Sequence, residues 1–326
     1  MSDVVGNEPL IHVSDEVEAA LAQRRPIVAL ESNVVAHGFT RPENLAVARE
    51  VEAVVRAGGA VPATIFLAPG RIVVGASPEE LETLATASDV AKVTTRDIAV
   101  TLARRAWGAT SIAATMAIAD RAGITTVASA GLGGVHRGAE TSMDISADLT
   151  ELARTRLIVV CAGVKKILDA GRTLEFLETQ GTPVIGYGHR EFPAFYCRGS
   201  GFDTQARIDD PREIAEIARL HLRLNKTGSV LVTHPIPVAD ALDGDRIEAA
   251  IVQALARAAA ERVSGPAVTT FVLRAVDAAT GGAAAAANRA VLISTARAAT
   301  EIEVARVAAA SEVDRIVNAR EISHVN

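Results

Sequence analysis

Cysteine is scarce in this sequence, and long apolar runs are missing. Among 326 residues only Cys161 and Cys197 occur, and Cys161 lies inside the apolar run 157–162, where a small buried side chain is expected. Apolar stretches such as 112–119 are much shorter than the roughly 20 residues that a membrane-spanning helix requires. No basic segment followed by an apolar one opens the chain. We therefore expect a cytoplasmic protein with reduced thiols and no membrane partner.

Lysine is also rare, and positive charge is not concentrated anywhere. The net charge of −6 is spread over mixed-sign segments, which argues against a nucleic-acid partner and favours a small-molecule substrate. Only four of the 33 basic residues are lysine, namely Lys92, Lys165, Lys166 and Lys226. Genomic base composition explains the many arginines but not these exceptions. A lysine in a dry pocket can become a neutral nucleophile, whereas arginine stays protonated, so these lysines are candidates for amine chemistry.

Segments of strand and helix character alternate along most of the chain. Strands are expected at 27–30, 61–67, 71–75, 91–93, 125–129, 157–161, 183–187 and 229–232. Helices are expected at 15–24 (with Asp15 as N-cap), 42–57, after Ser77, between 98 and 122, and at 145–153, 167–179, 211–224, 247–262 and 283–309. This alternation is typical of an α/β fold with a mixed, largely parallel sheet. No Pro, Gly or Ser-rich linker divides residues 1–326, which predicts one domain with an appended lobe and peripheral termini at 1–10 and 311–326.

A glycine-rich segment, GLGGVHRG from Gly131, follows the strand predicted to end near Ser129. Backbone N–H groups in such a loop can approach an anion closely, and His136 with Arg137 can add charge, so one interpretation is a phosphate cradle. A dinucleotide fingerprint is a weaker interpretation, because His136 occupies its last glycine position. A tight structural turn remains an equal alternative.

The carboxylates of Asp144, Asp148 and Glu151 follow this loop at spacings of four and three. On a helix these spacings place them on one face, where they could hold a hard divalent cation. An acidic, solvated helix start gives the same pattern, because acids favour the positive end of the helix dipole.

Two lysines and one glutamate occupy the ends of predicted buried strands. Lys165 and Lys166 come directly after the strand at 157–161, at the end where open α/β sheets bind their ligands. Lys92 lies within a strand, so its ammonium needs a phosphate or a carboxylate as partner. Glu31 ends the strand at 27–30 and is a candidate proton donor, although a lone glutamate is equally consistent with a salt bridge.

Taken together, several segments resemble one known family. They are LESNVVAHG from Leu30, AKVTTRD from Ala91, GATSIAATM from Gly108, GLGGVHRGAETSMDISADLTELART from Gly131, VVCAGVKKILDAGRTLEFLETQG from Val159 and EFPAFY from Glu191. In this order, over roughly residues 10 to 300, they are similar to the pseudouridine-5'-phosphate glycosidases, also called the indigoidine synthase A-like family.

The resemblance implies an α/β/α sandwich with a smaller appended lobe, assembled as a homotrimer. It also implies a Mn²⁺-dependent enzyme that reversibly breaks the C–C bond between ribose 5-phosphate and uracil in pseudouridine 5'-phosphate. Lys165 falls on the lysine that forms an imine with ring-opened ribose, Glu31 on the proton donor and Asp144 on the metal ligand. The positions matched to substrate binding are Lys92, Ile112, Ser129, His136, Ser146, Ala147, Asp148 and Asn288.

Departures from the family pattern concern the leaving group. Asn33 stands where a threonine is usual, Ser129-Ala130 where Thr-Gly is usual, and region 269–294 matches more loosely. Because polar contacts decide such selectivity, a synthase that joins ribose 5-phosphate to another aromatic acceptor is an alternative. A Schiff-base aldolase and a non-catalytic sugar-phosphate-binding protein are further alternatives.

Overall fold

The structure of this chain is a computed structural model that describes residues 9–225, 227–263 and 266–323. Residues 1–8 and 324–326 of the predicted peripheral termini, together with Lys226, lie outside the described residues. No helix in the described part of the chain is long and apolar enough to cross a membrane. Cys161 and Cys197 are both buried and unpaired, which confirms the prediction of a small buried side chain at Cys161.

One mixed sheet runs through the molecule. Its main path joins β1 (Ile11–Val13), β4 (Arg71–Val74), β3 (Val61–Ala68), β2 (Ile27–Glu31), β7 (Thr126–Ala128), β9 (Ile158–Cys161), β13 (Val230–Thr233), β11 (Val184–Tyr187) and β12 (Ala206–Ile208). Two further strands, β5 (Ala91–Val93) and β6 (Gly108–Thr110), branch from β3. All pairings are parallel except β3 with β4 and β3 with β6. The predicted mixed, largely parallel sheet is thereby confirmed, and the strands expected at 61–67 and 71–75 pair as the antiparallel β3 and β4.

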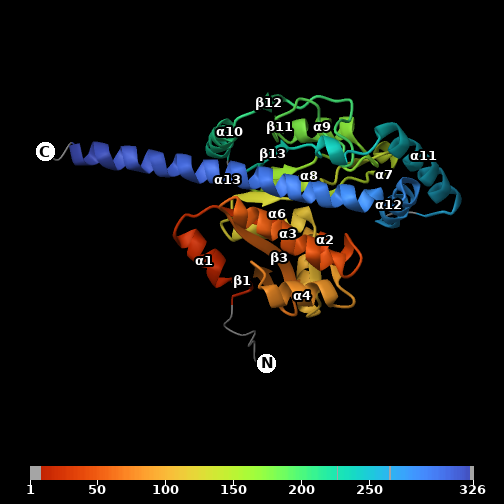
Figure 1. Cartoon of the computed structure of the whole chain (residues 1–326), viewed down its shortest axis with the longest axis horizontal. Coiled ribbons are helices and arrows are strands. Elements are labelled where there is room, and N and C mark those ends of the chain that lie inside the picture. The colour runs from red at the N-terminus through yellow and green to blue at the C-terminus, as the bar shows by residue number, and fades with distance from the viewer. Residues whose placement is uncertain (1–8, 226, 264–265, 324–326) are drawn as a thin grey trace.

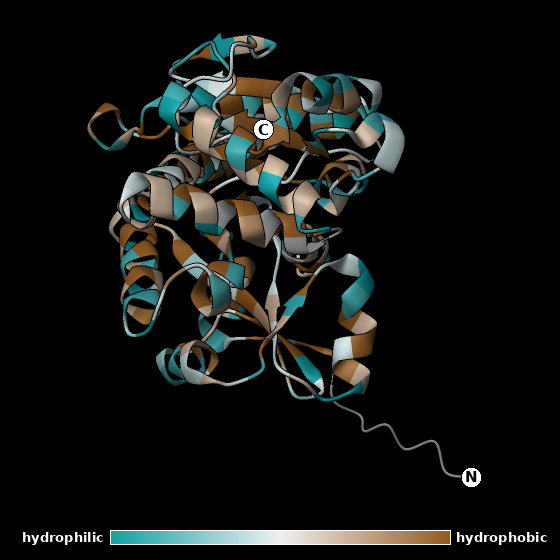
Figure 2. Ribbon diagram, turned by 90° about the vertical axis from the view of Figure 1, so that its right-hand side faces the viewer, coloured by the Kyte–Doolittle hydropathy of each residue, from teal (hydrophilic) through white to brown (hydrophobic). Residues whose placement is uncertain are grey.

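The central strands are apolar on both faces because helices cover both. Along β2, Ile27 and Ala29 face one buried cluster while Val28 and Leu30 face another. This is the continuous apolar pattern expected of parallel strands that are buried on two sides. Figure 2 shows these apolar strands in brown, running through the interior between helices whose outer faces carry hydrophilic residues.

Helices on the two faces give the predicted α/β/α arrangement (Figure 1). One face is covered by α1 (Asp15–Ala22), α6 (Ile112–Arg121), α8 (Ala147–Arg154), α9 (Ala170–Thr179), α11 (Gly244–Ala260) and α12 (Pro266–Thr280). The other is covered by α3 (Glu43–Ala57), α10 (Pro211–Leu224) and the long α13 (Ala283–Ser323). Shorter elements are α2 (Asn33–His37), η1 (Thr95–Asp97), α5 (Ile98–Ala103), β8 (Val135–His136), α7 (Ala139–Ser142), β10 (Leu168–Asp169) and η2 (Val238–Asp240).

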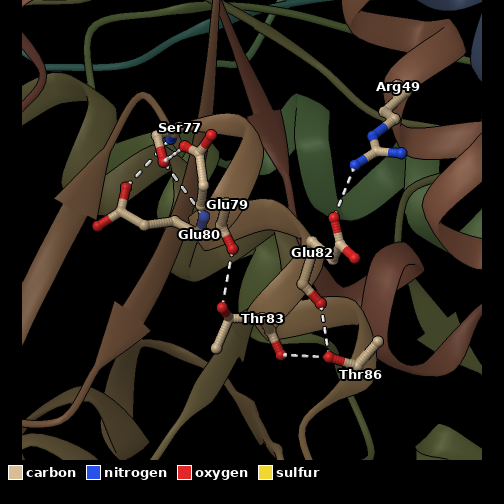
Figure 3. A network of polar contacts seen from close by, with 7 residues as sticks. All are labelled: Arg49, Ser77, Glu79, Glu80, Glu82, Thr83 and Thr86. Carbon is tan, nitrogen blue, oxygen red and sulfur yellow. Dashed lines mark hydrogen bonds and ion pairs between the residues drawn. The ribbon is translucent and has the colours of Figure 1, made fainter.

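The helix predicted after Ser77 is α4 (Pro78–Thr86), and its start is a complete capping box. The Ser77 hydroxyl accepts the backbone N–H of Glu80 at 3.2 Å, and the Glu80 carboxylate accepts the N–H of Ser77 at 3.1 Å (Figure 3). Arg49 of α3 forms an ion pair of 3.0 Å with Glu82 of α4. Two N–H groups that have no partner within the helix thus gain side-chain acceptors, so the helix begins where the sequence indicates.

Three details of the predicted elements are wrong. The N-cap of α1 is Ser14, which accepts the N–H of Val17, and Asp15 is already helical. Strand β6 interrupts the predicted helical region between 98 and 122, because its three residues are fully buried between β3 and β5. The helix predicted from 167 begins only at Ala170, since β10 pairs with β8 and Asp169 then caps α9.

Candidate active site

The carboxyl ends of β2, β7 and β9 meet at one edge of the sheet. These strands are neighbours and parallel, with Leu30 opposite Ala128 and Ala128 opposite Val160. Glu31 is the last residue of β2, Ser129 follows β7, and the loop after β9 carries Lys165. Parallel strand order therefore brings together side chains that are more than 130 residues apart in the chain.

Glu31 is held in a state that favours its protonated form. Burial raises the pKa of the Glu31 carboxyl above its ordinary value, because the charged form loses hydration. The Ser129 hydroxyl donates a hydrogen bond to Glu31, which acts in the opposite direction, as do the Lys165 and Lys92 ammonium groups. The net direction is upward, and such a carboxylic acid can donate a proton near neutral pH.

Two lysines and two carboxylates interact across the site. Lys92 lies on β5. Its pKa is lowered mainly because partial burial removes water from the ammonium, and the positive charge of Lys165 lowers it further. Asp148 and Glu31 act on Lys92 in the opposite direction. Although the Lys92 side chain reaches solvent, its predicted need for an anionic partner is therefore met in part by protein carboxylates.

Asp148 connects three elements through its buried carboxylate. One oxygen accepts the N–H of Ala113 in the first turn of α6 at 3.0 Å, and the other accepts the N–H of Gly133 at 2.8 Å. The residue is only 8% exposed and lies at the start of α8. A charged acceptor on two backbone donors is a strong interaction in such surroundings. Ile112, the first residue of α6, is fixed next to this contact.

The predicted helical metal face is wrong. Helix α8 begins at Ala147, so Asp144 precedes it, while Asp148 is engaged by backbone amides and Glu151 is buried on the helix. Among the described residues, no group of three or more His, Cys, Asp and Glu side chains is arranged to hold a metal ion. Asp144 instead keeps a half-exposed carboxylate, 3.6 Å from Nδ1 of His136.

The glycine-rich loop uses its amides inside the protein. Leu132 donates to the carbonyl of Gly163, Gly133 to Asp148, Val135 to the hydroxyl of Thr173, and His136 to the carbonyl of Asp144. A Cβ atom on Gly131 would overlap the ring of Phe195, and one on Gly133 would overlap Ser146. Close packing accounts for these glycines, which favours the structural-turn interpretation over a backbone phosphate cradle.

Arg137 does not add charge to the loop in the manner expected. Its guanidinium forms two hydrogen bonds with Glu248 of α11, at 2.6 and 2.9 Å, and a third with the carbonyl of Lys166 at 2.9 Å. Arg137 therefore joins the glycine-rich loop, the loop that carries Lys165 and Lys166, and helix α11. The sequence carries no signal for this pairing because Glu248 lies 111 residues away.

The other predicted site residues are distributed around this centre. Ser146 caps α8, its hydroxyl accepting the N–H of Asp148, and Ala147 is the first residue of that helix. Asn288 lies half-buried near the start of α13. The structure thus brings Glu31, Ser129, Lys92, Lys165 and Asp148 into one interacting group, while His136 and Asp144 form a separate pair.

Ser32 and Thr110 are positioning residues that the sequence reasoning missed. The Ser32 hydroxyl accepts the N–H of Thr110 at 2.9 Å and lies 3.2 Å from its hydroxyl. Both residues are fully buried, and they tie the end of β2 to the end of β6. For Ser32 the available signal was a small polar residue directly after a predicted apolar strand, whereas Thr110 had none because β6 carries no periodic pattern.

Comparison with known proteins shows the family of this chain. The family described as indigoidine synthase A-like protein matches residues 16–305. The chain belongs to this family. Pseudouridine-5'-phosphate glycosidases from Dickeya dadantii and a Nocardioides species are 50% and 48% identical to this indigoidine synthase A-like protein, over 91% and 89% of its chain and 94% of each relative.

Solved structures of two relatives share the fold. The prealnumycin C-glycosynthase AlnA in complex with ribulose 5-phosphate is 42% identical, with a TM-score of 0.88 over 94% of this chain and 99% of its own. An indigoidine synthase A-like protein from Thermotoga maritima is 32% identical, with a TM-score of 0.81 over 92% and 98% of the two chains. The predicted family and α/β fold are confirmed.

Replacing Asp148 by asparagine tests the buried carboxylate contact. In Asp148→Asn an amide NH₂ group faces a backbone N–H in place of an acceptor, so the free energy of unfolding should fall by about 1–3 kcal/mol. Denaturation by guanidinium chloride measures this change. The matched variant Asp144→Asn alters an exposed carboxylate and should change stability by less than about 0.5 kcal/mol. Equal effects of the two substitutions would contradict the assigned contact.

Proposed function

We propose that this protein is a C-glycosidase that reversibly cleaves pseudouridine 5'-phosphate to ribose 5-phosphate and uracil. The observation that carries the proposal is the pairing of Glu31, an acid with a raised pKa, with the amine of Lys165 at the carboxyl edge of the sheet. Relatives that are 50% and 48% identical are named pseudouridine-5'-phosphate glycosidases, which supports the same substrate. Shared fold alone would not specify it.

Cleavage of a C-glycoside requires an electron sink that ordinary glycosidases lack. Those enzymes protonate the oxygen of the leaving group, and a C–C bond offers no such oxygen. A lysine amine provides an alternative, because it can form an iminium with the sugar carbon. Lys165 is our proposed nucleophile, and the neighbouring Lys166 is not, since its carbonyl and side chain lie toward Arg137 and Glu248.

In the proposed reaction, the neutral Lys165 amine attacks C1', and the C1'–O4' bond breaks as O4' takes the proton that the attacking nitrogen loses, which opens the ribose ring. The nitrogen lone pair then forms a C=N bond, the electrons of the C1'–C5 bond pass to the base, C5 of uracil takes the proton of Glu31, and C1' becomes an iminium. Water adds to this iminium and releases ribose 5-phosphate and the free amine, and the proton set free in this step returns to Glu31. Ser129 holds the Glu31 carboxyl in place throughout.

The remaining predicted contacts would bind the sugar phosphate and the base. Lys92 interacts electrostatically with both Glu31 and Lys165, and its ammonium suits the phosphate. We assign Ile112, Ser146, Ala147 and Asp148 to the wall that positions the ribose, because the Asp148 contacts fix all of them together. His136 is our further phosphate contact and Asn288 our contact to the base.

A second candidate is a synthase that joins ribose 5-phosphate to a different aromatic acceptor. The observation that favours it is the likeness, at 42% identity, to a C-glycosynthase that binds ribulose 5-phosphate. Both candidates use the same lysine and acid and differ in the ring that occupies the base pocket. Synthesis is the reverse of cleavage, so one set of residues serves either direction.

A Mn²⁺ ion fits this site with one protein carboxylate and several water molecules as ligands, and not with a complete set of protein ligands. Asp144 offers one half-exposed carboxylate beside His136, and the described residues contain no larger group of ligands. Hard cations often keep several waters and one direct carboxylate. Asp144 would hold the ion, which when bound supplies positive charge and ordered water near the phosphosugar.

We further propose a homotrimer acting in the cytoplasm. The family resemblance supports the trimer, and two buried unpaired cysteines fit a reducing compartment. Sedimentation equilibrium tests the assembly, for which a 33.9 kDa chain predicts a particle of three times that mass.

Incubation with ribose 5-phosphate and uracil, in the presence of Mn²⁺, tests the proposed reaction and its nucleophile. Pseudouridine 5'-phosphate should form, and borohydride should trap the sugar on Lys165, as mapped by mass spectrometry. Lys165→Ala should lower the rate at least about 1,000-fold, because the covalent route is lost. The adjacent Lys166→Ala serves as control and should retain both product and adduct. An adduct on another lysine would exclude this mechanism, and product only with a different acceptor would select the synthase.

The pH dependence of kcat/KM tests the role of Glu31. The acid acts when protonated, so the rate should fall as pH rises through the raised pKa of Glu31. Ser129→Ala removes a hydrogen bond that lowers this pKa, so the falling limb should move to higher pH. Glu31→Gln should lose about 100-fold or more and show no such limb. If the falling limb stays at the same pH in Ser129→Ala, the limb does not report the ionisation of Glu31.

Metal removal tests the proposed role of Asp144 as the ligand of Mn²⁺. A chelator should slow cleavage, and added Mn²⁺ should restore it. In Asp144→Asn the Mn²⁺ concentration for half-maximal rate should rise about 10-fold or more, because the direct ligand is weakened. Asp203→Asn alters an equally exposed carboxylate that is paired with Arg190, and should leave this concentration unchanged. A chelator-insensitive rate would exclude the metal.

A further inference from the structure

Among the described residues, six buried side-chain atoms lack a hydrogen-bond partner, and one of them lies close to the proposed acid. They belong to Asn33, Thr182, His189, Ser200, His221 and His234. Asn33 follows Glu31 by two residues and opens the short helix α2. An unpaired buried polar atom destabilises the folded state, so one kept beside an active-site acid suggests a partner that arrives with the substrate.

Other polar side chains around α2 do find partners inside the protein. The Ser32 hydroxyl accepts the N–H of Thr110 at 2.9 Å. The carboxamide of Asn44 donates to the carbonyl of Val35 at 2.8 Å and to that of Ala85 at 3.0 Å. The unpaired atom of Asn33 is therefore not a general feature of this part of the fold.

The residues next to Asn33 and Asn288 belong to the same layer of the fold. Val34 packs against the apolar cluster that contains Leu30 and Ala130 from the carboxyl edge, and Ala287 from α13 belongs to the same cluster. Val34 follows Asn33, and Ala287 directly precedes Asn288. Asn33 thus lies on the chain between the proposed acid Glu31 and a residue packed on this cluster.

A carboxamide has the chemistry to recognise a cyclic imide. It offers one acceptor and two donors side by side, and half a turn about its terminal bond exchanges their positions. A pyrimidinedione presents adjacent C=O and N–H groups along its edge, which an aromatic hydrocarbon does not. We propose that Asn33 determines specificity by forming paired hydrogen bonds with the C=O/N–H edge of a pyrimidinedione leaving group, an inference that rests on the proposed function.

Asn33→Leu tests this proposal, with uracil and ribose 5-phosphate as product inhibitors of pseudouridine 5'-phosphate cleavage. The inhibition constant of uracil should rise about 10- to 100-fold, the range expected from one or two lost hydrogen bonds. The constant for ribose 5-phosphate and borohydride trapping at Lys165 should not change. The melting temperature should stay the same or rise, since an apolar side chain replaces an unpaired polar one.

Asn44→Leu is the matched control. It removes a fully partnered carboxamide, so it should lower the melting temperature while leaving the uracil constant unchanged. Asn33→Ala, which cannot overpack, should repeat the selective loss of uracil binding. A lowered melting temperature for both Asn33 variants, or an unchanged uracil constant, would overturn the inference alone. Failure of the unaltered protein to cleave pseudouridine 5'-phosphate would overturn the proposed function and this inference together.

Discussion

The buried carboxylate of Asp148 is the contact on which the site depends. It accepts N–H groups from the glycine-rich loop and from the first turn of α6 while itself standing at the start of α8. A charge removed from water in this way is stable only when its hydrogen bonds are made. The glycine-rich loop and the starts of α6 and α8 therefore keep one relative arrangement.

Four ionisable side chains surround this contact and interact with one another. Two amines, Lys92 and Lys165, interact with the carboxyl groups of Glu31 and Asp148. The two carboxyl groups nevertheless have different surroundings. Glu31 accepts one hydrogen bond from a hydroxyl group and has a raised pKa, whereas Asp148 accepts two from backbone N–H groups. Two similar groups in one site can in this way serve different purposes.

Much of the fold was predictable because apolar runs and amphipathic segments follow different periods. The buried strands at 27–31, 158–161 and 230–233 and the capping box at Ser77 follow directly from local sequence. Strand β6 was missed because three small residues, Gly108-Ala109-Thr110, carry no periodic pattern. Asp148 was assigned to a helix face with Asp144, and only tertiary structure shows that backbone amides engage it. Family resemblance located Glu31 and Lys165, whereas the Arg137–Glu248 pair had no local signal.

The interaction between Glu31 and Lys165 makes the surroundings of each group depend on the other. Burial raises the pKa of the Glu31 carboxyl, and a positive charge on Lys165 opposes this rise. A substitution that removes the Lys165 side chain would therefore alter the surroundings of the carboxyl as well as the amine, so the effects of changing the two residues should not add.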